Sequence, residues 1–418
     1  MIYVLLDGVG DLPHPDLDGM TPLEAASTPN LDQLCKNGAL GQVISVGRGI
    51  APESDIAVFN MLGYKFSHSD YVGRGVIESI GVGLDFQNGH LALRGNFATM
   101  DDSGIITDRR AGRTIDREDA ISISKELEEK IQFSDGASSI MVAPTIGHRV
   151  TVVLRSDKQL SGKVTNTDPA YSNIGGMGIA KAVGDGLQIE RCQPMIPEAT
   201  HSALLINEFT EQSTCIMKNS SVNARRHQSS QKILSCILLR DAGSRYPVLV
   251  PIDKKYSMSF SCIVDMPVEL GIAKVLKMKT FEAGDITDYT KKAQVAAEAM
   301  QTQNANYVHI KGPDEYGHDG DAKGKARNIQ DIDRNFFGPL LDIIDTERVA
   351  VVVSADHATP CINKAHSDDP VPLLVSGINT KADSTSRMTE AYARQGRIGL
   401  LEGSQVLSTA IDIIRAEK

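Results

Sequence analysis

Three apolar runs in this chain each lead into side chains that bind metal ions well. Asp356 and His357 follow VAVVVSA, Asp7 follows IYVLL, and Asp314 with His318 comes shortly after ANYVHI. A parallel strand buried on both faces has such an apolar sequence, and ligands of open α/β sheets bind beyond the carboxyl ends of the strands. The sequence therefore predicts an α/β fold in which these side chains meet at one edge of a sheet.

The chemistry of these side chains indicates a divalent metal ion. Carboxylate oxygen and imidazole nitrogen together suit Zn, Mn or Fe, whereas carboxylates with water suit Mg. His366 follows His357 by nine residues and adds another imidazole. A lone Asp after a strand is commonly a turn residue or a helix cap, so the prediction depends on the three clusters together.

Ser54 lies in the segment APESDIAVFNMLGY and has two interpretations. A short apolar helix is expected from about Ile56 to Leu62, and Ser54 is placed to be its N-cap. Alternatively, the free N–H groups of the helix N-terminus face a phosphoryl group, and Ser54 is a nucleophile activated by a nearby metal. The segment alone leaves both interpretations open.

An arginine-rich region begins near Gly73, where the sequence changes to GRGVIESIGVG, LALRGNFATM and TDRRAGR. Guanidinium groups bind phosphate and carboxylate in a bidentate manner, so this region is suited to a small phosphorylated or carboxylated anion. A solvated charged surface is the simpler alternative. The arginines concerned are Arg74, Arg94, Arg109, Arg110 and Arg113.

Strands and helices alternate in the last third of the chain, which predicts a mostly parallel sheet with crossover helices. The segment 247–251 is interpreted as a link back to a first domain, so that residues 1–72 and 252–418 form one domain and residues 73–251 an insertion. Strands are expected at 2–6, 148–154, 232–239, 307–310 and 371–375 and in the β-branched run that starts at 349 and leads into Asp356. Helices are expected from about 29 to 38, within 207–231, and at 291–301, 326–341 and 403–415.

The composition is that of an ordinary globular protein, with 41% hydrophobic and 23% charged residues among 418. A net charge of −10 argues against general affinity for nucleic acid or for an anionic membrane. The six cysteines form no CxxC pair, which fits reduced thiols and a cytoplasmic location. Neither a signal peptide nor a run of roughly 20 apolar residues is visible.

One metal ion usually takes fewer protein ligands than the seven candidates in this chain, so the simplest interpretation is two ions roughly 3.5–4 Å apart. The seven candidates are Asp7, Ser54, Asp314, His318, Asp356, His357 and His366. With these donors in place, the chain resembles the alkaline phosphatase superfamily and, within it, the archaeal-type cofactor-independent phosphoglycerate mutases. The resemblance extends over nearly the whole chain and is carried by LLDGVGD, PESD, GRGVIE, LRGNFAT, DRRAGR, DEYGHDGD, SADHATP and HSDDPVP.

The resemblance implies an alkaline-phosphatase-like sheet flanked by helices, with an inserted α/β substrate domain. It also implies interconversion of 3-phosphoglycerate and 2-phosphoglycerate through a phosphoserine, without added 2,3-bisphosphoglycerate. The arginines would hold the substrate, and Asp108 would be an acid/base for the glycerate hydroxyls. One ion would be held by Asp314, His318 and His366, and the other by Asp7, Ser54, Asp356 and His357, with Mn or Mg expected and Co or Zn tolerated.

The chain departs from many members of that family beside the serine, where Glu53 and Ile56 replace Gly and Thr. An acid next to the nucleophile is expected to alter metal affinity or the pH dependence of the rate. Two alternatives remain open from the sequence. One is a metal-dependent phosphohydrolase or another phosphomutase of the same superfamily, and the other is a metal-dependent binding protein without catalytic activity.

Overall fold

The computed structural model describes residues 1–66, 71–174, 177–180 and 186–416. The chain divides into two compact units. The first unit comprises Met1–Phe66, Val250–Asp265 and Leu276–Lys418, and the second unit comprises Ser67–Leu249 and Met266–Val275. Each unit has its own sheet and is described by itself.

The first unit contains an eight-stranded sheet in the order β11-β10-β12-β1-β13-β14-β2-β15. Its strands are β1 (Ile2–Leu6), β2 (Gly38–Ile44), β10 (Phe260–Ile263), β11 (Lys279–Thr280), β12 (Ala305–Ile310), β13 (Val351–Ser354), β14 (Val371–Ser376) and β15 (Gly399–Glu402). Its helices are α1 (Pro22–Ala25), α2 (Pro29–Lys36), α3 (Ser54–Met61), α8 (Ile252–Tyr256), α10 (Tyr289–Ala299), α11 (Pro313–Asp319), α12 (Ala322–Ile332), α13 (Gly338–Ile343), α14 (Glu390–Ala393) and α15 (Gly403–Arg415).

Strand β1 occupies the middle of this sheet. It pairs in parallel with β12 on one side and with β13 on the other, so that Ile2 faces both Asn306 and Val351. The strands from β11 to β13 are all parallel, and β14 alone runs antiparallel to its neighbours β13 and β2. The predicted mostly parallel sheet is confirmed, and the carboxyl ends of β12, β1 and β13 therefore meet at one edge.

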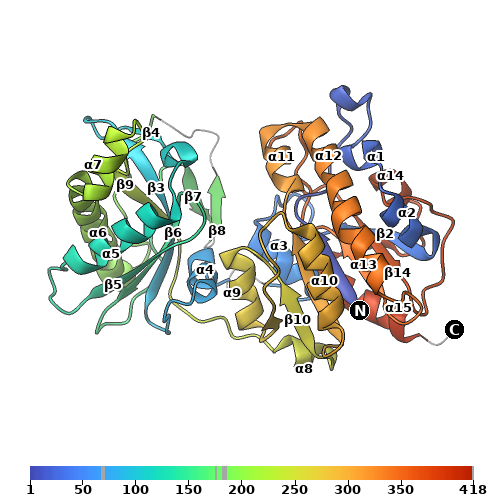
Figure 1. Cartoon of the computed structure of the whole chain (residues 1–418). Helices are drawn as coiled ribbons and strands as arrows, with labels where there is room; N and C mark the ends of the chain where they lie inside the picture. The colour runs from blue at the N-terminus through green and yellow to red at the C-terminus, as the bar shows by residue number, and fades with distance from the viewer. Residues whose placement is uncertain (67–70, 175–176, 181–185, 417–418) are drawn as a thin grey trace. The chain divides into compact units, whose positions relative to one another are not determined.

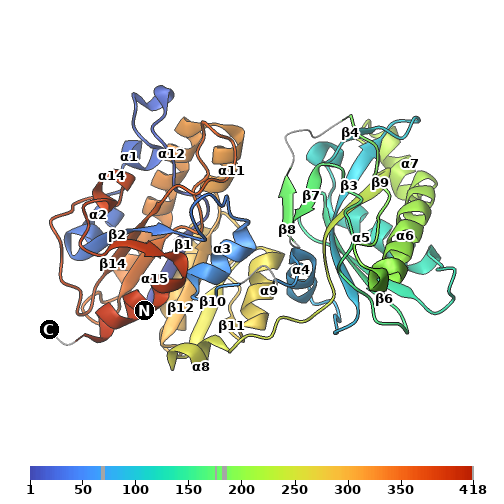
Figure 2. The same ribbon diagram turned by 180° about the vertical axis from the view of Figure 1, so that it is seen from behind.

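Helices cover both faces of the first sheet. Figure 1 shows α10, α12 and α13 in front of the strands, and Figure 2 shows α3 and α15 on the opposite face. All five residues of β1 are buried, as are all six of β12 and all four of β13. This two-sided cover explains why these strands have uninterrupted apolar sequences.

The second unit is built on a five-stranded antiparallel sheet, in which β3 pairs with β4, β6 and β9, and β5 pairs with β6. Its strands are β3 (Leu91–Met100), β4 (Ile106–Asp108), β5 (Ser139–Pro144), β6 (Arg149–Arg155), β9 (Cys236–Gly243) and a separate hairpin of β7 (Tyr171–Ile174) and β8 (Met177–Ala180). Its helices are α4 (Arg74–Gly81), α5 (Arg117–Lys130), α6 (Thr200–Lys218), α7 (Ser221–Gln228) and α9 (Pro267–Val275).

Helices α5 and α6 cover one face of the antiparallel sheet. Leu91, Leu93 and Phe97 of β3 point to that face and pack with Ile123 of α5 and Phe209 of α6 in one core. Because side chains alternate along a strand, the residues between them point to the other face of the sheet. That other face carries the polar residues described below.

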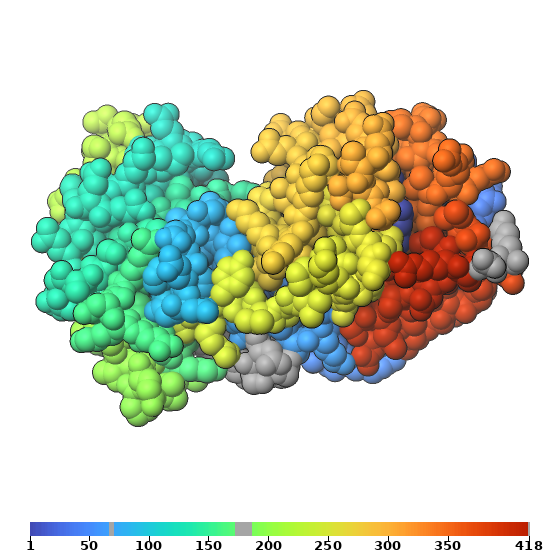
Figure 3. Space-filling model, turned by 90° about the horizontal axis from the view of Figure 1, so that it is seen from below, coloured from blue at the N-terminus to red at the C-terminus, as the bar shows by residue number. Residues whose placement is uncertain are grey.

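Helix α9 belongs to the second unit because it packs closely on α4. A Cβ atom added to Gly271 would lie 2.0 Å from the carbonyl oxygen of Ile77, and one added to Gly81 would lie 1.8 Å from that of Pro267. Only glycine permits this approach of the two backbones. The space-filling view shows the two helices side by side (Figure 3). The predicted domain ranges, in which α9 falls within 252–418, stay a prediction.

One strand and one helix of these two units differ in their bounds from the prediction. The strand expected at 232–239 is β9, which starts at Cys236, because Leu234 donates its N–H to the Asn223 side chain and is held in a loop. The helix expected at 326–341 starts earlier, at Ala322, and is interrupted by a π-helical turn at Asp333–Phe337. That turn carries Asp333, whose carboxylate accepts the N–H groups of Asn30 and Leu31.

Candidate active site

The carboxyl edge of the first sheet brings the predicted metal ligands into two groups. The buried group consists of Asp7 after β1 and of Asp356 and His357 after β13. The outer group consists of Asp314 and His318 on α11, which follows β12, and of His366 before β14, and its side chains are more exposed. Within each group the candidate ligand atoms lie within 4.8 Å of one another.

The buried group contains two carboxylate oxygens that lack hydrogen-bond partners within the described residues. Asp356 accepts the N–H groups of Gly8 and His357 with Oδ1, each at 3.1 Å, which leaves Oδ2 without a hydrogen bond. Asp7 Oδ1 is also buried without a hydrogen bond. These two oxygens lie 3.4 and 3.6 Å from His357 Nε2. Burial of unsatisfied carboxylate oxygens is costly, so the three atoms fit a bound cation.

The electrostatics of this group agree with that interpretation. Burial raises the pKa of Asp356 well above its usual range, and the neighbouring Asp7 raises it further. Burial also acts to raise the pKa of Asp7, but Lys311, His309 and His357 together outweigh it and the net pKa is lowered. Burial lowers the pKa of His357 to about 3, and His366 contributes in the same direction, so the imidazole is neutral and able to bind a metal.

In the outer group, backbone carbonyls orient the two histidines. His366 Nδ1 lies 2.7 Å from the Pro52 carbonyl oxygen, and His318 Nδ1 lies 3.2 Å from that of Lys364. A carbonyl only accepts hydrogen bonds, so each Nδ1 carries a proton and each Nε2 is the atom that could bind a metal ion. The two Nε2 atoms are 3.2 Å apart, and Asp314 Oδ1 is 3.5 Å from that of His366. These three atoms could together bind a cation.

The pKa of His366 reflects this arrangement. Burial acts to lower it, but the hydrogen bond and the charge of Asp314 outweigh burial and raise the pKa to about 9. Burial likewise acts to raise the pKa of Asp314, yet the surrounding histidines hold it well below its usual range. The outer group therefore favours positive charge at its centre.

Ser54 is the first residue of α3 and not its N-cap, so the helix predicted to begin at Ile56 begins two residues earlier. Glu53 is the N-cap, because its backbone is extended and its carbonyl accepts the first helical hydrogen bond, from Ala57. Ser54 Oγ lies 3.5 Å from His357 Nε2. The hydroxyl thus faces the buried group, next to the free N–H groups and the positive dipole end of α3.

Three residues near the ligands were not predicted from the sequence: His309, Lys311 and Thr359. Lys311 follows β12 and donates a hydrogen bond of 2.9 Å to Asp7 Oδ2. His309 is fully buried in β12, with its Nε2 3.6 Å from Asp356 Oδ2. The available signal was the pattern VHIK, in which His309 lies within the apolar strand and Lys311 follows it two residues later, a spacing that places both on one face.

In the second unit, the sheet face opposite the helices carries three arginines from three adjacent strands. Arg94 of β3 is opposite Arg240 of β9, and Arg149 of β6 is opposite Asn96 of β3. Arg240 Nη2 also lies 3.3 Å from Asn96 Oδ1. Arg149 and Arg240 were missed because each stands next to the end of an apolar run, VTVVL or CILL, where a charged residue commonly marks only the boundary.

Two more arginines complete a group that we call the arginine cluster: Arg74, Arg94, Arg109, Arg149 and Arg240. Arg74 of α4 and Arg94 approach Glu78 Oε1 at 2.9 and 3.2 Å. Asp168 accepts hydrogen bonds from Arg109 at 2.7 Å and from Arg240 at 3.1 Å. The guanidinium of Arg240 also lies 4.5 Å from the centre of the Tyr171 ring, a cation–π distance.

The arginine cluster has more positive than negative charge. The carboxylates that pair with its five guanidinium groups include those of Glu78, Asp168 and Asp241. Burial lowers the pKa of Arg149 to about 10, and Arg94 and Arg74 lower it as well. Burial and the same cationic surroundings lower the pKa of His148 to about 3. An anion bound at this face would relieve the repulsion.

Comparison with known proteins identifies the chain. A profile of 2,3-bisphosphoglycerate-independent phosphoglycerate mutases matches residues 35–223. The 2,3-bisphosphoglycerate-independent phosphoglycerate mutase of Aeropyrum pernix is 36% identical over 415 residues, which cover 96% of both chains. The chain belongs to this family. It is therefore an isomerase, and the family predicted from the motifs is confirmed.

Solved structures agree with membership of the phosphoglycerate mutase family. A protein from Pyrococcus horikoshii superposes with a TM-score of 0.81 at 28% identity, covering 100% of this chain and 98% of that one. A cofactor-independent phosphoglycerate mutase from Thermoplasma acidophilum gives a TM-score of 0.66 at 27% identity, covering 99% of both.

Among the helices formed by the described residues, none has the length and apolar character needed to cross a bilayer.

Asp108 of this phosphoglycerate mutase family member has a clear structural role. Its two carboxylate oxygens accept the N–H groups of Arg110 and Gly112, at 2.8 and 2.9 Å. They hold a turn in which Ala111 and Arg113 have positive φ angles of 44° and 55°. The side chains of Arg110 and Arg113 are exposed. A role for Asp108 as acid/base stays a prediction.

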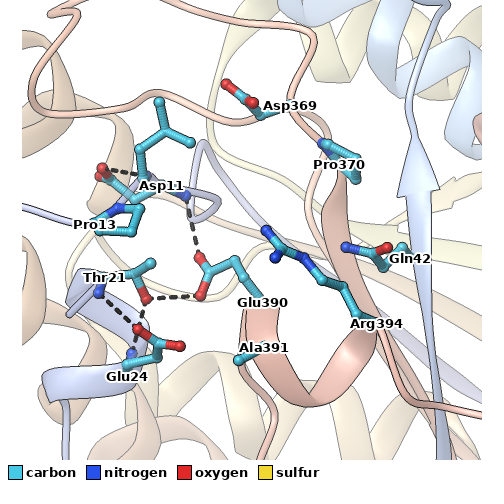
Figure 4. A pocket seen from close by; sticks show the side chains of 11 residues that line it. Asp11, Pro13, Thr21, Glu24, Gln42, Asp369, Pro370, Glu390, Ala391 and Arg394 are labelled. Carbon is cyan, nitrogen blue, oxygen red and sulfur yellow. Dashed lines mark hydrogen bonds between the residues drawn. The ribbon is translucent and has the colours of Figure 1, made fainter. Parts of the chain in front are cut away.

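The first unit also has a cavity of about 200 Å³ between the β1–α1 segment and α14, and none of the candidate metal ligands lines it (Figure 4). Glu390 lines this cavity and accepts hydrogen bonds from the Asp11 N–H at 3.2 Å and the Thr21 hydroxyl at 2.7 Å. Burial raises the pKa of Glu390 to about 7, although these hydrogen bonds act against burial.

This pKa predicts a pH-dependent contribution to stability. As pH rises from the ordinary Glu value of 4.5 towards 7, the unfolded chain has already lost the Glu390 proton while the folded chain retains it. The free energy of unfolding should therefore fall over this interval. Urea denaturation at pH about 5 and about 7.5 should show a smaller fall for Glu390→Gln than for the unchanged protein; equal pH dependence would contradict the assignment.

Proposed function

We propose that this protein interconverts 3-phosphoglycerate and 2-phosphoglycerate through a phosphoserine at Ser54, beside two divalent metal ions and without added 2,3-bisphosphoglycerate. The observation that supports the proposal most strongly is the position of Ser54 Oγ. It lies 3.5 Å from His357 Nε2 and next to the buried group with its two unsatisfied carboxylate oxygens. A hydroxyl at a helix N-terminus among metal-binding groups is suited to receive a phosphoryl group.

Each of the two groups of side chains would hold one divalent ion. Asp314, His318 and His366 would hold one ion, and Asp7, Ser54, Asp356 and His357 would hold the other. Mn and Mg are the first candidates, and Co and Zn tolerate parts of the same set. When bound, the ions neutralise the phosphoryl charge and lower the pKa of the Ser54 hydroxyl.

The chain's own residues account for the remaining steps. Ser54 Oγ forms a bond to phosphorus as the bond between phosphorus and the substrate's 3-oxygen breaks, which leaves glycerate and phosphoserine. The 2-hydroxyl of the retained glycerate then attacks the phosphoserine, so that 2-phosphoglycerate forms and the serine hydroxyl is restored. The arginine cluster, with Arg110 and Arg113, would hold the substrate carboxylate and phosphate. Retention of glycerate between the two transfers distinguishes a mutase from a hydrolase.

The direct test is an assay with metal-stripped protein. We expect no turnover of 3-phosphoglycerate until Mn or Mg is added, and then 2-phosphoglycerate with little free phosphate, without any 2,3-bisphosphoglycerate. Both products should be measured in the same reaction. Phosphate as the main product would indicate the metal-dependent phosphohydrolase instead, and equal turnover in the presence of chelator would contradict the metal requirement.

A second prediction separates binding from stability in the arginine cluster. Because Arg149 has a lowered pKa of about 10, its charge is disfavoured in the folded protein. Arg149→Met should therefore leave the melting temperature unchanged or raise it. The KM for 3-phosphoglycerate should rise about 10- to 100-fold, as expected when a charged hydrogen bond worth about 1.5–3 kcal/mol is lost.

The matched control is Arg191→Met. Arg191 pairs with Glu211 at 3.2 Å in the same unit, and both side chains are about two-thirds exposed. This control should change neither KM nor the melting temperature. An unchanged KM in Arg149→Met, or an equal rise in the control, would remove the basis for a substrate-binding role of the cluster.

A further inference from the structure

The hydroxyl of Thr359 connects the two candidate metal groups. Thr359 Oγ1 lies 2.7 Å from Asp314 Oδ1 of the outer group and 3.1 Å from His357 Nδ1 of the buried group. Thr359 itself is fully buried. A single side chain therefore contacts one predicted ligand of each ion.

The proton positions in this chain follow from simple hydrogen-bond chemistry. The Asp314 carboxylate can only accept, so the one hydroxyl proton of Thr359 is donated to it. The hydroxyl oxygen must then accept from His357, so His357 Nδ1 carries a proton. In a neutral imidazole, Nε2 is then the atom with a free lone pair, and this is the atom that faces Asp7, Asp356 and Ser54.

The backbone of Thr359 is held as firmly as its hydroxyl. Its N–H donates to the Gly10 carbonyl at 3.0 Å, and its carbonyl accepts from Lys325 Nζ at 2.9 Å. Lys325 is in turn paired with Asp11 at 2.8 Å, with both side chains fully buried. On the other side, a Cβ atom added to Gly317 of α11 would lie 2.4 Å from the Thr359 carbonyl oxygen. The hydroxyl is thus presented in a fixed place.

We propose that Thr359 is a positioning residue that couples the two metal groups. It orients Asp314 in the outer group and fixes the tautomer and ring orientation of His357 in the buried group. A metal ion bound in one group therefore helps to orient a ligand of the other group for its own ion. The inference rests on the two-ion site proposed above. Residues that orient metal ligands in this way commonly change metal affinity by about 10- to 100-fold when they are replaced.

The test is titration of metal-free protein with Mn²⁺, with free Mn²⁺ followed by electron paramagnetic resonance. The unchanged protein should bind two ions. Thr359→Val should bind both ions about 10- to 100-fold more weakly, whereas Thr359→Ser, which keeps the hydroxyl, should retain the affinity of the unchanged protein. Thr359→Ala, which places no methyl group against Asp314, provides a second variant should the valine variant fail to fold.

Thr380→Val is the matched control, because Thr380 is buried in the same unit and its hydroxyl has no hydrogen bond within the described residues. It should bind both ions normally. A second measurement reports on His357 directly. In ¹⁵N-histidine-labelled metal-free protein, the His357 signals, assigned by their loss in His357→Gln, should show the Nδ1–H tautomer in the unchanged protein and in Thr359→Ser. They should show a mixture in Thr359→Val.

The outcomes separate the inference from the proposed function. Tight binding of two ions by both the unchanged protein and Thr359→Val would overturn the role of Thr359 and leave the two-ion site standing. Weakening of one ion only, or an equal loss in the Thr380→Val control, would also overturn the coupling. Failure of the unchanged protein itself to take up a second ion would overturn the two-ion site and, with it, the inference.

Discussion

Replacing Ser54 with alanine is expected to lower kcat on 3-phosphoglycerate by at least about 10⁴-fold, the scale of loss seen when a catalytic nucleophile is removed. The Ser54 hydroxyl is the proposed acceptor of the phosphoryl group, and its oxygen lies 3.5 Å from His357 Nε2. Activity should be measured with saturating Mn, together with the mass of acid-quenched protein. The unchanged protein should show a phosphate adduct on the peptide that contains Ser54, and the variant should show none.

Two observations would decide how the Ser54 result is interpreted. Ser408→Ala, at an exposed position of α15, should retain full activity and serves as the control for a serine-to-alanine change. Mn binding by the Ser54 variant should remain measurable, because Asp7, Asp356 and His357 are unchanged. Turnover at a near-normal rate without a phosphoserine would contradict the covalent step.

Lys325→Met should lower the free energy of unfolding by about 3–5 kcal/mol, the usual cost of breaking a buried ion pair by removing one partner. Lys325 and Asp11 are both fully buried, 2.8 Å apart. Lys325 also donates to the Gly10 carbonyl at 3.1 Å and to the Thr359 carbonyl at 2.9 Å. Its loss leaves a buried carboxylate and two carbonyls without this donor. Urea denaturation followed by circular dichroism would measure the change.

Two further variants make the Lys325 prediction specific. Replacing both partners, by Asp11→Leu with Lys325→Met, should recover part of the loss because no charge remains buried. Recovery should be incomplete, since the Cys361 N–H loses the Asp11 acceptor. Lys65→Met breaks an exposed pair with Glu402, 3.0 Å long, and should cost less than about 1 kcal/mol. Equal losses in Lys325→Met and Lys65→Met would contradict the argument.

Much of the first unit could be predicted from local sequence patterns. The strand at Ile2–Leu6 and the helix at Gly403–Arg415 have the bounds expected from their apolar patterns. Predictions failed where distant residues decide the structure. Strand β9 starts late because Asn223, on α7, holds Leu234 in a loop, and α9 packs on α4 through glycine contacts that no periodicity in either helix indicates.

In the candidate site, too, some residues could be predicted from local sequence and others depend on distant contacts. The candidate ligands could be grouped from the sequence because Asp or His follows several strands, and parallel strands end at one edge of the sheet. Thr359 and Lys311 could not be found in this way, since Thr and Lys are common residues whose role depends on the side chains they contact. The Ser54 helix start was misplaced by two residues because serine is a frequent N-cap, whereas Glu53 takes that place here.

The central position of β1 has a consequence for synthesis of the chain. The strands on its two sides, β12 and β13, begin at Ala305 and Val351, so β1 has neither neighbour while the first 300 or so residues emerge from the ribosome. Because domains generally fold as units during translation, the nascent second unit can acquire most of its structure while β1 is still without its two neighbouring strands. Asp7 and Ser54, translated early, meet His366 only when translation is nearly complete.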